Sequence, residues 1–311
     1  MRWLDGPAAV RVPATSANLG PGFDSFGLAL TLHDTVEARV IASGIQLDVI
    51  GMGSGTAQAG EQHLVLRAMR AGFDAAGAQP AGIALSCRNA IPHGFGLGSS
   101  AAAILAGLLL ARALASEEGA AALPDAEVLT LATELEGHPD NVAACMVGGL
   151  TVAWQSGSRS VSAARMEPLA DLAPVVCVPT SPLATEVARK VLPASVPHAD
   201  AAANSARTAL LIAGLTSQPE LLLAGTEDFL HQRYRADSMP ATTALIAELR
   251  AAGIPAAVSG AGPSVLALPV TSAQAEAVGV LAVGADTDAD WQVLPLSVDR
   301  SGAQLVSPAD E

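Results

Sequence analysis

Lysine is nearly absent from this sequence. Of the 16 basic residues only Lys190 is a lysine, and the others are arginines. No run of basic residues occurs, and the formal net charge is −14. A nucleic-acid partner is therefore not expected, because proteins that bind phosphate backbones carry basic stripes. A phosphate loop of the Walker type is excluded as well, because that loop requires a lysine directly after its second glycine.

Aromatic residues and cysteines are also scarce. Phe, Trp and Tyr make up 3% of the chain while half of it is hydrophobic, so we expect a core of Ala, Val, Leu and Ile. Cys87, Cys145 and Cys177 stand far apart in the sequence and are expected to be reduced core thiols in a cytoplasmic protein. The longest apolar run, 101–111, is too short to span a bilayer, and no membrane partner is expected.

Short β-type runs alternate with helical patterns along the 311 residues, without the regular β-α-β succession of a doubly wound sheet. This pattern predicts an α+β protein, and the length indicates two domains. The polar segment 155–164 is the expected join, which divides the chain into 1–158 and 159–311. Strands are expected at 8–12, 36–41, 45–50, 83–87, 149–154, 175–179, 256–259, 265–268 and 291–295. Helices are expected at 62–76, 99–115, 125–136, 184–191, 201–215, 219–230, 242–252 and 273–282.

A glycine-rich segment, PHGFGLGSSAAAIL at 92–105, comes directly before one of these helical patterns. Small residues let backbone N–H groups approach an anion, and the N-terminus of a helix adds about half a positive charge. Ser99 or Ser100 is expected to cap the helix, and either hydroxyl could face phosphate or a metal ion. The loop lacks the Gly-x-Gly-x-x-Gly spacing of dinucleotide-binding folds. By itself it fits either a phosphate site or a plain turn before a packed helix.

Two further stretches decide between these readings. PATSANLGPGFDSFGLAL at 13–30 and AVSGAGPSVLA at 257–267, together with the glycine-rich segment, resemble the three motifs of the GHMP kinases in their order. GHPDNV at 137–142 and HQRYR at 231–235 are similar to the homoserine kinases of that family. The resemblance implies an α+β, two-domain GHMP kinase fold. Its N-terminal domain would be like the second domain of ribosomal protein S5, and its C-terminal domain would be ferredoxin-like.

The resemblance also implies the ligands. ATP and L-homoserine would bind between the domains, and the protein would be a homodimer. The phosphates of ATP would lie in the segment formed by Pro92, His93, Gly94, Phe95, Gly96, Leu97, Gly98, Ser99, Ser100, Ala101 and Ala102. Mg²⁺, a hard ion that prefers oxygen ligands, would be held by Ser99 and Glu136. Glu134 is the alternative carboxylate.

An amino-acid substrate needs both a cation and an anion in its pocket. The resemblance assigns Arg189 and Arg235 to the carboxylate, which the planar guanidinium can bind with two hydrogen bonds. Asp24 would pair with the ammonium. The remaining substrate-binding residues that it implies are Asn18, His138, Asn141 and Thr185.

Asn141 stands where many members of the family have a catalytic aspartate. Because a carboxamide cannot accept a proton as a base, we expect catalysis by positioning, with the hydroxyl proton leaving late to the phosphate. The expected catalytic residues are Ser99, Glu136 and Asn141, with Asp140 left open as a base. Two other functions also stay open: a kinase of the same family acting on shikimate or a mevalonate-type acid, and a ligand sensor without catalysis.

Overall fold

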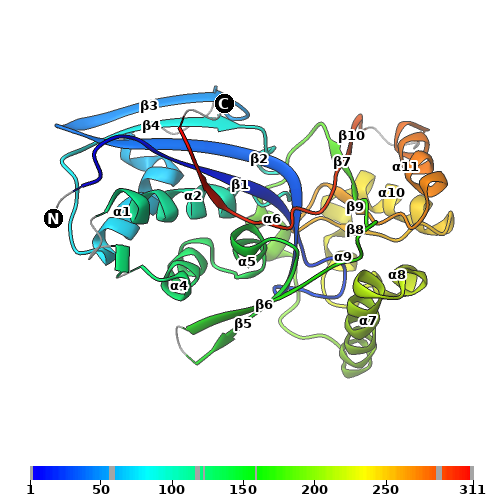
Figure 1. Ribbon diagram of the computed structural model, residues 1–311. Coiled ribbons are helices and arrows are strands. Elements are labelled where there is room, and N and C mark those ends of the chain that lie inside the picture. The colour runs from blue at the N-terminus through cyan, green and yellow to red at the C-terminus, as the bar shows by residue number, and fades with distance from the viewer. Residues whose placement is uncertain are drawn as a thin grey trace.

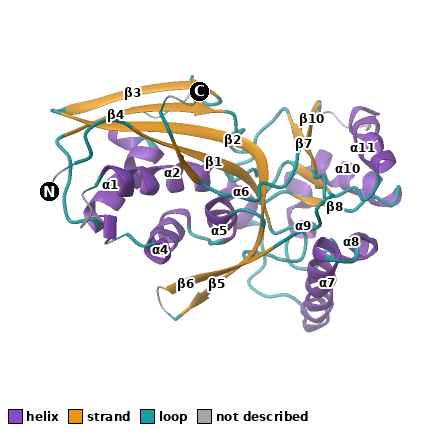
Figure 2. Cartoon of the chain, viewed as in Figure 1, coloured by secondary structure: helices purple, strands orange, loops and turns teal. Residues whose placement is uncertain are grey.

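Two β-sheets with helices packed against them make up the protein (Figures 1 and 2). The computed structural model describes residues 3–55, 60–115, 120–121, 123–157, 160–284 and 289–308. Helices and strands mix along the chain, and most of the paired strands are antiparallel. The α+β class predicted from the sequence is therefore confirmed.

The first sheet has seven strands in the order β11-β1-β2-β4-β3, with β5 paired to the first part of β2 and β6 paired to β5. All of these pairs are antiparallel except β3–β4. The strands are β1 (Ala8–Ala17), β2 (Phe26–Ile41), β3 (Gly44–Gly51), β4 (Gly82–Asn89), β5 (Leu150–Ser156), β6 (Ser160–Met166) and β11 (Gln304–Val306).

Four of the described helices cover one face of this sheet (Figure 1): α1 (Leu64–Ala75), α2 (Ser99–Leu114), α4 (Asp125–Glu136) and α5 (Asp140–Val147). Helix α2 is apolar on nearly all sides and mostly buried, as expected of a helix inside a core. It packs closely on α1, since a Cβ added at Gly107 would lie 2.4 Å from the Val65 carbonyl oxygen. This packing fixes the direction in which the N-terminus of α2 points.

The second sheet is antiparallel, in the order β10-β7-β9-β8. Its strands are β7 (Val175–Pro179), β8 (Ala256–Val258), β9 (Val265–Ala267) and β10 (Trp291–Pro295). The helices of this half are α6 (Thr185–Lys190), α7 (His198–Thr216), α8 (Leu222–Gly225), α9 (Gln232–Arg235), α10 (Pro240–Ala251) and α11 (Ser272–Gly284). Single 3₁₀ turns lie at Gly60–Gln62, Pro219–Leu221 and Ala236–Ser238.

The core is aliphatic, as the composition predicts. Its larger cluster consists mainly of Ala, Val, Leu and Ile side chains, with Phe26 and Phe73 among the few aromatic ones. The three cysteines are buried and free, and burial raises the pKa of the Cys87 thiol to about 12. No helix among the described residues is long and apolar enough to cross a membrane.

Several boundaries differ from the sequence prediction. The predicted strand 36–41 is only the last part of β2, which runs for 16 residues because its first part pairs with β1 and β5. The predicted helix at 219–230 is wrong beyond Gly225, because the Asp228 carboxylate binds the backbone N–H groups of Leu230 and Gln232 there and forms a turn. Helix α5 was not predicted.

The expected serine cap of α2 is also wrong. The N-cap position is held by Gly98 in the left-handed conformation, and no side chain caps the helix. The segment 155–164 belongs to the β5–β6 hairpin, except for residues 158–159, which lie outside the described residues. The division of the chain after residue 158 stays a prediction. The strands β6 and β11, which follow that point, pair within the first sheet.

Candidate functional site

A tight turn at residues 18–25 joins β1 to β2. Asn18, Leu19 and Asp24 have φ angles of +68°, +52° and +54°, a region that residues other than glycine seldom adopt. The Asn18 Oδ1 atom accepts the backbone N–H of Asp24 at 2.9 Å, which closes the turn. Backbone strain of this kind persists where surrounding contacts enforce it, and it is typical of functional sites.

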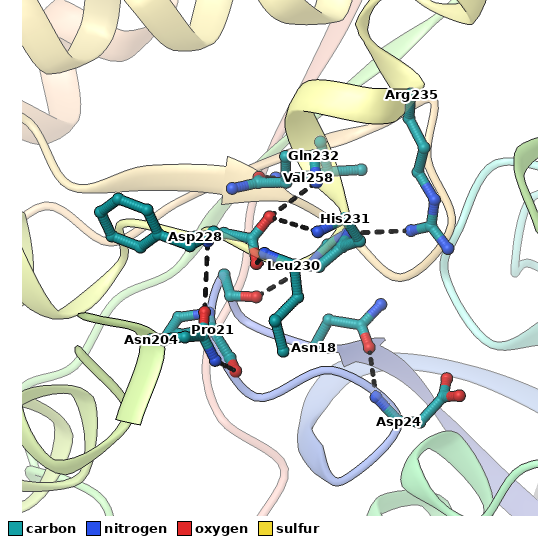
Figure 3. Close-up of polar contacts among 12 residues, drawn as sticks. Asn18, Pro21, Asp24, Asn204, Asp228, Leu230, His231, Gln232, Arg235 and Val258 are labelled. Carbon is teal, nitrogen blue, oxygen red and sulfur yellow. Dashed lines mark hydrogen bonds and ion pairs between the residues drawn. The ribbon is translucent and has the colours of Figure 1, made fainter. Parts of the chain in front are cut away.

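Contacts from the second half of the chain hold this turn in place (Figure 3). The Asn18 Nδ2 atom donates to the Gly260 carbonyl oxygen at 2.8 Å. The Asn204 Nδ2 atom, on α7, donates to the Pro21 carbonyl oxygen at 2.8 Å. The first and third sequence motifs, 242 positions apart at Asn18 and Gly260, are therefore joined directly.

His231 joins the same turn to Arg235. Its Nε2 atom lies 2.8 Å from the Gly20 carbonyl oxygen, which can only accept, so Nε2 carries the hydrogen. Its Nδ1 atom then accepts the Arg235 NH1 group at 3.0 Å. Burial lowers the pKa of His231, and the nearby Arg235 guanidinium acts in the same direction. His231 is therefore neutral at neutral pH and orients the arginine.

The glycine-rich loop ends at the N-terminus of α2. Gly94, Gly96 and Gly98 have φ angles of +81°, +74° and +69°, which glycine adopts without steric cost. A Cβ at Gly96 would lie 2.2 Å from the Ser259 carbonyl oxygen, and one at Gly98 would lie 2.0 Å from Thr15 Oγ1. The loop is thus packed between β1 and the third motif, and it leads to backbone N–H groups suited to an anion.

Two buried serines connect the three motifs. The Ser259 hydroxyl donates to the Gly96 carbonyl oxygen at 2.7 Å and lies 2.8 Å from Ser16 Oγ. Because a hydroxyl has a single hydrogen, Ser16 is the donor to Ser259. This chain of hydroxyls runs from β1 through the third motif to the loop, so the loop conformation depends on both neighbours.

Glu136, the last residue of α4, faces the first turn of α2. The Ser100 hydroxyl donates to its Oε2 atom at 2.5 Å. Burial raises the pKa of Glu136, with the Ser100 bond and the neighbouring His138 acting in the opposite direction. The Ser100 hydroxyl and the Glu136 carboxylate offer two neighbouring oxygen ligands, and this donor set fits Mg²⁺.

His138 and Asp140 form a second charged pair. The His138 Nδ1 atom lies 2.6 Å from Asp140 Oδ1, and its Nε2 atom lies 4.0 Å from Glu136 Oε1. Burial disfavours the imidazolium, but the hydrogen bond to Asp140 and the charges of Asp140 and Glu136 raise the pKa of His138 overall. The Asp140 Oδ1 atom also accepts the backbone N–H of Asn141 at 2.7 Å. Asp140 is therefore already engaged by donors.

Arg189, on α6, forms a two-bond ion pair with Asp24. Its NH2 and NH1 groups donate to Oδ1 at 2.6 Å and Oδ2 at 3.1 Å. The hydrogen bond to Asp24 raises the pKa of Arg189, although burial acts in the opposite direction. Phe23, at the tip of the turn, lies 5.7 Å from the Arg189 guanidinium and 5.6 Å from that of Arg235, measured to the ring centre. One aromatic ring thus orients both arginines.

Arg235, on α9, is only 1% exposed. Its Nε donates to the Ala188 carbonyl oxygen at 3.0 Å and its NH1 to the Gly260 carbonyl oxygen at 3.3 Å. No carboxylate of the described residues forms an ion pair with it. Burial and the neighbouring Arg189 lower its pKa to about 10. A buried cation without an anionic partner is costly, so this position favours an anionic ligand.

These groups meet at a cleft of about 200 Å³. The cleft is lined by Ala17, Asn18, Gly94, Gly96, Leu97, Gly98, Ser99, Ser100, Glu136, His138, Asp140, Asn141, Thr185, Arg189, Arg235, Gly260 and Ala261. Most of the residues predicted from the sequence are therefore brought together, from segments far apart in the chain.

A second cavity of about 270 Å³ lies beside the cleft and shares Ser99 and Ser100 with it. Its walls are mainly apolar, with residues such as Val36 and Val65. The Nδ1 atom of His63 is buried and has no hydrogen-bond partner among the described residues, and burial lowers the pKa of this histidine. The phosphate loop thus separates a polar cleft from an apolar cavity, an arrangement that suits a nucleotide lying across it.

A few predicted residues do not line the cleft. Asp24 is connected to the cleft by its ion pair with Arg189, which lines it. Of the predicted nucleotide segment, His93 and Ala102 line the second cavity, while Pro92 and Phe95 line a separate apolar hollow. Ala101 is buried inside α2. The serine bonded to Glu136 is Ser100, while Ser99 lines both cavities.

Sequence reasoning missed several residues that position the site. Thr15 hydrogen-bonds Asn141, Phe23 packs on both arginines, and Asn204 and Asp228 hold the loops around the 18–25 turn. Phe23 could have been found, because an aromatic residue within a Gly/Pro-rich turn stands out in a chain so poor in aromatics. Asn204 and Asp228 carried no sequence signal, since they lie outside the recognisable motifs.

Comparison with known proteins identifies two family models along the chain. The GHMP kinases N terminal domain matches residues 63–149, and the GHMP kinases C terminal domain matches residues 210–279. The first covers the glycine-rich loop, α2 and the segment that bears Glu136 and Asn141. The second covers α9 and the third motif, which bear Arg235 and Gly260.

Similar curated proteins extend along almost the whole chain. The homoserine kinase of Streptomyces coelicolor is 54% identical over 297 residues, which are 96% of this chain and 94% of that protein. The homoserine kinase of Mycobacterium tuberculosis is 46% identical over 270 residues, which are 85% of each.

Solved structures also superimpose on nearly the whole chain. The crystal structure of a homoserine kinase from Cytophaga hutchinsonii superimposes with a TM-score of 0.84 at 24% identity, covering 98% of this chain and 99% of that one. A putative homoserine kinase from Listeria monocytogenes gives 0.76 at 28% identity over 97% and 100%. The crystal structure of a mevalonate diphosphate decarboxylase from Staphylococcus aureus superimposes with a TM-score of 0.65 at 16% identity, covering 97% of this chain and 98% of that one, and it shows a shared fold alone.

Proposed function

Because this chain belongs to the GHMP kinase family, and within it to the homoserine kinases, we propose that it transfers the γ-phosphoryl group of ATP to the side-chain hydroxyl of L-homoserine. The product is O-phospho-L-homoserine, which lies on the route to threonine. The observation that carries the proposal is Arg235, a buried cation that lines the cleft and has no ion-pair partner in the described part of the chain. A substrate carboxylate supplies the missing charge.

Homoserine fits the charges around the cleft. Its carboxylate binds Arg235, with Arg189 close by on α6, while its ammonium binds Asp24. A ligand with a carboxylate alone can pair with Arg235 but offers no cation to Asp24, which is now paired with Arg189. A zwitterion pairs with both at once. This favours an amino acid over shikimate or a mevalonate-type acid, which carry a carboxylate only.

ATP fits the two cavities that the glycine-rich loop separates. Its phosphates lie against the loop and the first N–H groups of α2, where the helix dipole favours negative charge. Its adenosine enters the apolar cavity, where the unpartnered His63 Nδ1 can accept a hydrogen bond. The γ-phosphate then faces the cleft that holds the acceptor hydroxyl.

Glu136 and Ser100 are the residues that would hold Mg²⁺, because their oxygens are already 2.5 Å apart at the end of the loop. Ser99, which also lines the cleft, is the neighbouring hydroxyl that the resemblance assigns to this role. When bound, the ion neutralises part of the phosphate charge. Glu134 is less suited, since Glu136 and not Glu134 lines the cleft.

The transfer itself needs no dedicated base. The substrate hydroxyl oxygen attacks the γ-phosphorus, the bond from that phosphorus to the β,γ-bridging oxygen breaks, and ADP leaves with the electron pair. The hydroxyl proton passes to an oxygen of the transferred phosphoryl group. Asn141 orients the hydroxyl and the loop N–H groups stabilise the developing charge. Asp140 holds His138 and the start of α5.

A coupled assay of ADP release tests this function. Mg-ATP is supplied with L-homoserine, shikimate, mevalonate or galactose, and turnover is expected with homoserine alone. Chelation of the metal with EDTA is expected to abolish it. In Asp24→Asn the KM for homoserine should rise about 10–100-fold while the KM for ATP changes less than about 3-fold, since one charged hydrogen bond is lost.

Asp48→Asn is the matched control, because Asp48 lies exposed on β3 away from the cleft. It should change neither constant. Turnover of another acid without turnover of homoserine would overturn the substrate assignment, and an unchanged KM in Asp24→Asn would overturn the ammonium site. A cytoplasmic location and a homodimer stay proposals, supported by the free buried thiols and by the sequence resemblance respectively.

A further inference from the structure

Thr15 is a buried residue on β1 that contacts two parts of the cleft. Its hydroxyl donates to the Asn141 Oδ1 atom at 2.8 Å, and its backbone N–H donates to the Leu97 carbonyl oxygen at 3.0 Å. Its side chain lies directly beneath Gly98, where no Cβ could fit. Thr15 is fully buried and does not line the cleft, so any role in the reaction passes through its neighbours.

The contacts of Asn141 agree on one orientation of its carboxamide. The oxygen faces the Thr15 hydroxyl, and the Nδ2 atom lies 3.5 Å from Asp140 Oδ1. If the carboxamide were turned over, its oxygen would face the Asp140 carboxylate oxygen, and two acceptors would repel each other. In the observed orientation the Thr15 hydroxyl has an acceptor, and Asp140 faces a donor.

This orientation decides what Asn141 offers to a ligand. Its oxygen is bound to Thr15, so the group left for the cleft is the N–H of the carboxamide. A hydroxyl that accepts this N–H through one lone pair keeps its hydrogen for a phosphate oxygen and a second lone pair for phosphorus. A carbonyl oxygen in the same place would accept the hydroxyl hydrogen instead and turn the lone pairs away.

We propose that Thr15 is a positioning residue for phosphoryl transfer, because its hydroxyl holds the Asn141 carboxamide with the N–H donor toward the acceptor hydroxyl. The inference rests on the proposed function, since it specifies how that same cleft presents the substrate oxygen. It adds a residue of the first motif that contacts neither ATP nor homoserine. Its effect falls on the reacting geometry and not on affinity for either substrate.

Thr15→Val and Thr15→Ser separate the hydroxyl from the shape of the side chain. Valine keeps the volume but leaves the Asn141 oxygen without a donor, so kcat should fall about 10–100-fold, as for the loss of one buried hydrogen bond. Both KM values should change less than about 3-fold. Serine keeps the hydroxyl and should retain most of kcat. In an Asn141→Ala background, Thr15→Val should cost less than about 3-fold more, because the two residues act as one unit.

Thr130→Val is the matched control. Thr130 is also a buried threonine, but its hydroxyl binds only the Ala126 carbonyl oxygen of its own helix at 2.8 Å, and kcat should stay unchanged. The thermal midpoint of each variant is measured first, and Thr15→Ala replaces Thr15→Val if the latter is unfolded at the assay temperature.

Equal losses in Thr15→Ser and Thr15→Val, a rise in KM with kcat intact, or additive losses in the Asn141→Ala background would each overturn the inference. So would full activity of Thr15→Val. These results are distinguishable from failure of the proposed function, in which the unmodified protein itself does not phosphorylate homoserine.

Discussion

At Arg235 the chain places a positive charge on a side chain that is only 1% exposed. The carbonyl oxygens of Ala188 and Gly260 and the Nδ1 atom of His231 accept its N–H groups, but none of these partners carries a negative charge. A lysine could not replace it, because an ammonium has three donors at one point while the guanidinium spreads five over a plane. The cleft therefore needs an arginine at position 235, and a lysine could not take its place.

The residue most open to a different role is Asp140. In Asp140→Asn we expect kcat to fall less than about 10-fold, because the carboxamide oxygen can still accept from His138 and from the Asn141 backbone. A base would give a different result, since a carboxamide cannot take a proton. Steady-state constants with homoserine and ATP, measured at several pH values, check this.

A loss of three or more powers of ten in kcat at constant homoserine KM would restore Asp140 as the base. A limb of the pH–rate profile that disappears in the variant would support the same conclusion.

At the scale of the elements, features that lie within sequence motifs were predicted. Features that depend on pairing between distant strands were not. The loop at 92–98 and the cleft residues Asn18, Glu136 and Arg235 follow from their motifs. By contrast, the first part of β2 gains its strand conformation from pairing with β1 and β5, which no local pattern reveals. The hydrogen bond of Ser100, and not Ser99, to Glu136 depends on how α2 is rotated about its axis, which the sequence of the loop does not reveal.

The glycine-rich loop is also the element where a single methyl group should matter most. In Gly96→Ala the new Cβ would meet the Ser259 and Gly262 carbonyl oxygens at 2.2 Å and 2.8 Å, and the loop must move. We expect kcat/KM for ATP to fall at least about 100-fold, because loop N–H groups displaced by even 1 Å lose their contact with phosphate. Initial rates over a range of ATP concentrations measure the effect.

Gly44→Ala is the control for this variant. Gly44 has nearly the same φ, +75°, but no atom of the residues that the structure describes lies within 4 Å of its Cβ position. It should lower stability by about 1 kcal/mol and leave the kinetics unchanged. Equal kinetic losses in both variants would mean that backbone strain, and not the close approach to Ser259, limits the loop.

At the scale of the whole molecule, β11, the last described strand, forms one edge of the first sheet by pairing with β1. Asp299 anchors the segment that leads to it, accepting the backbone N–H groups of Ser301 and Gly302 at 2.9 Å and 2.7 Å. His33, on β2, lies 2.7 Å from its other carboxylate oxygen. Although burial acts in the opposite direction, these hydrogen bonds lower the pKa of Asp299. This carboxylate thus joins the end of the described chain to its first sheet.

The lowered pKa of Asp299 in the folded protein determines how its contribution to stability depends on pH. The ionised form favours the folded protein, so the stabilisation is complete above the unfolded pKa of about 3.9 and is lost as pH falls through the lower native value. Asp299→Asn should therefore lower the free energy of unfolding at pH 7 by about 1–3 kcal/mol. The difference from the unmodified protein should shrink below pH 4. Denaturant unfolding between pH 3 and pH 7 measures it.

Asp125→Asn serves for comparison, because Asp125 forms an exposed ion pair with Arg112. Exposed pairs contribute less than about 1 kcal/mol. A difference for Asp299→Asn that is as small at pH 7, or that grows as the pH falls, would contradict the role of the carboxylate.

The pairing of β11 with β1, which sets Ala9 opposite Val306, has a consequence for how the protein is made. Synthesis proceeds from the N-terminus, so β1 leaves the ribosome long before its partner exists. During that interval its outer edge offers unpaired N–H and C=O groups, the feature that leads nascent chains to associate wrongly. The first sheet can reach its final strand order only after residues 304–306 have been synthesised.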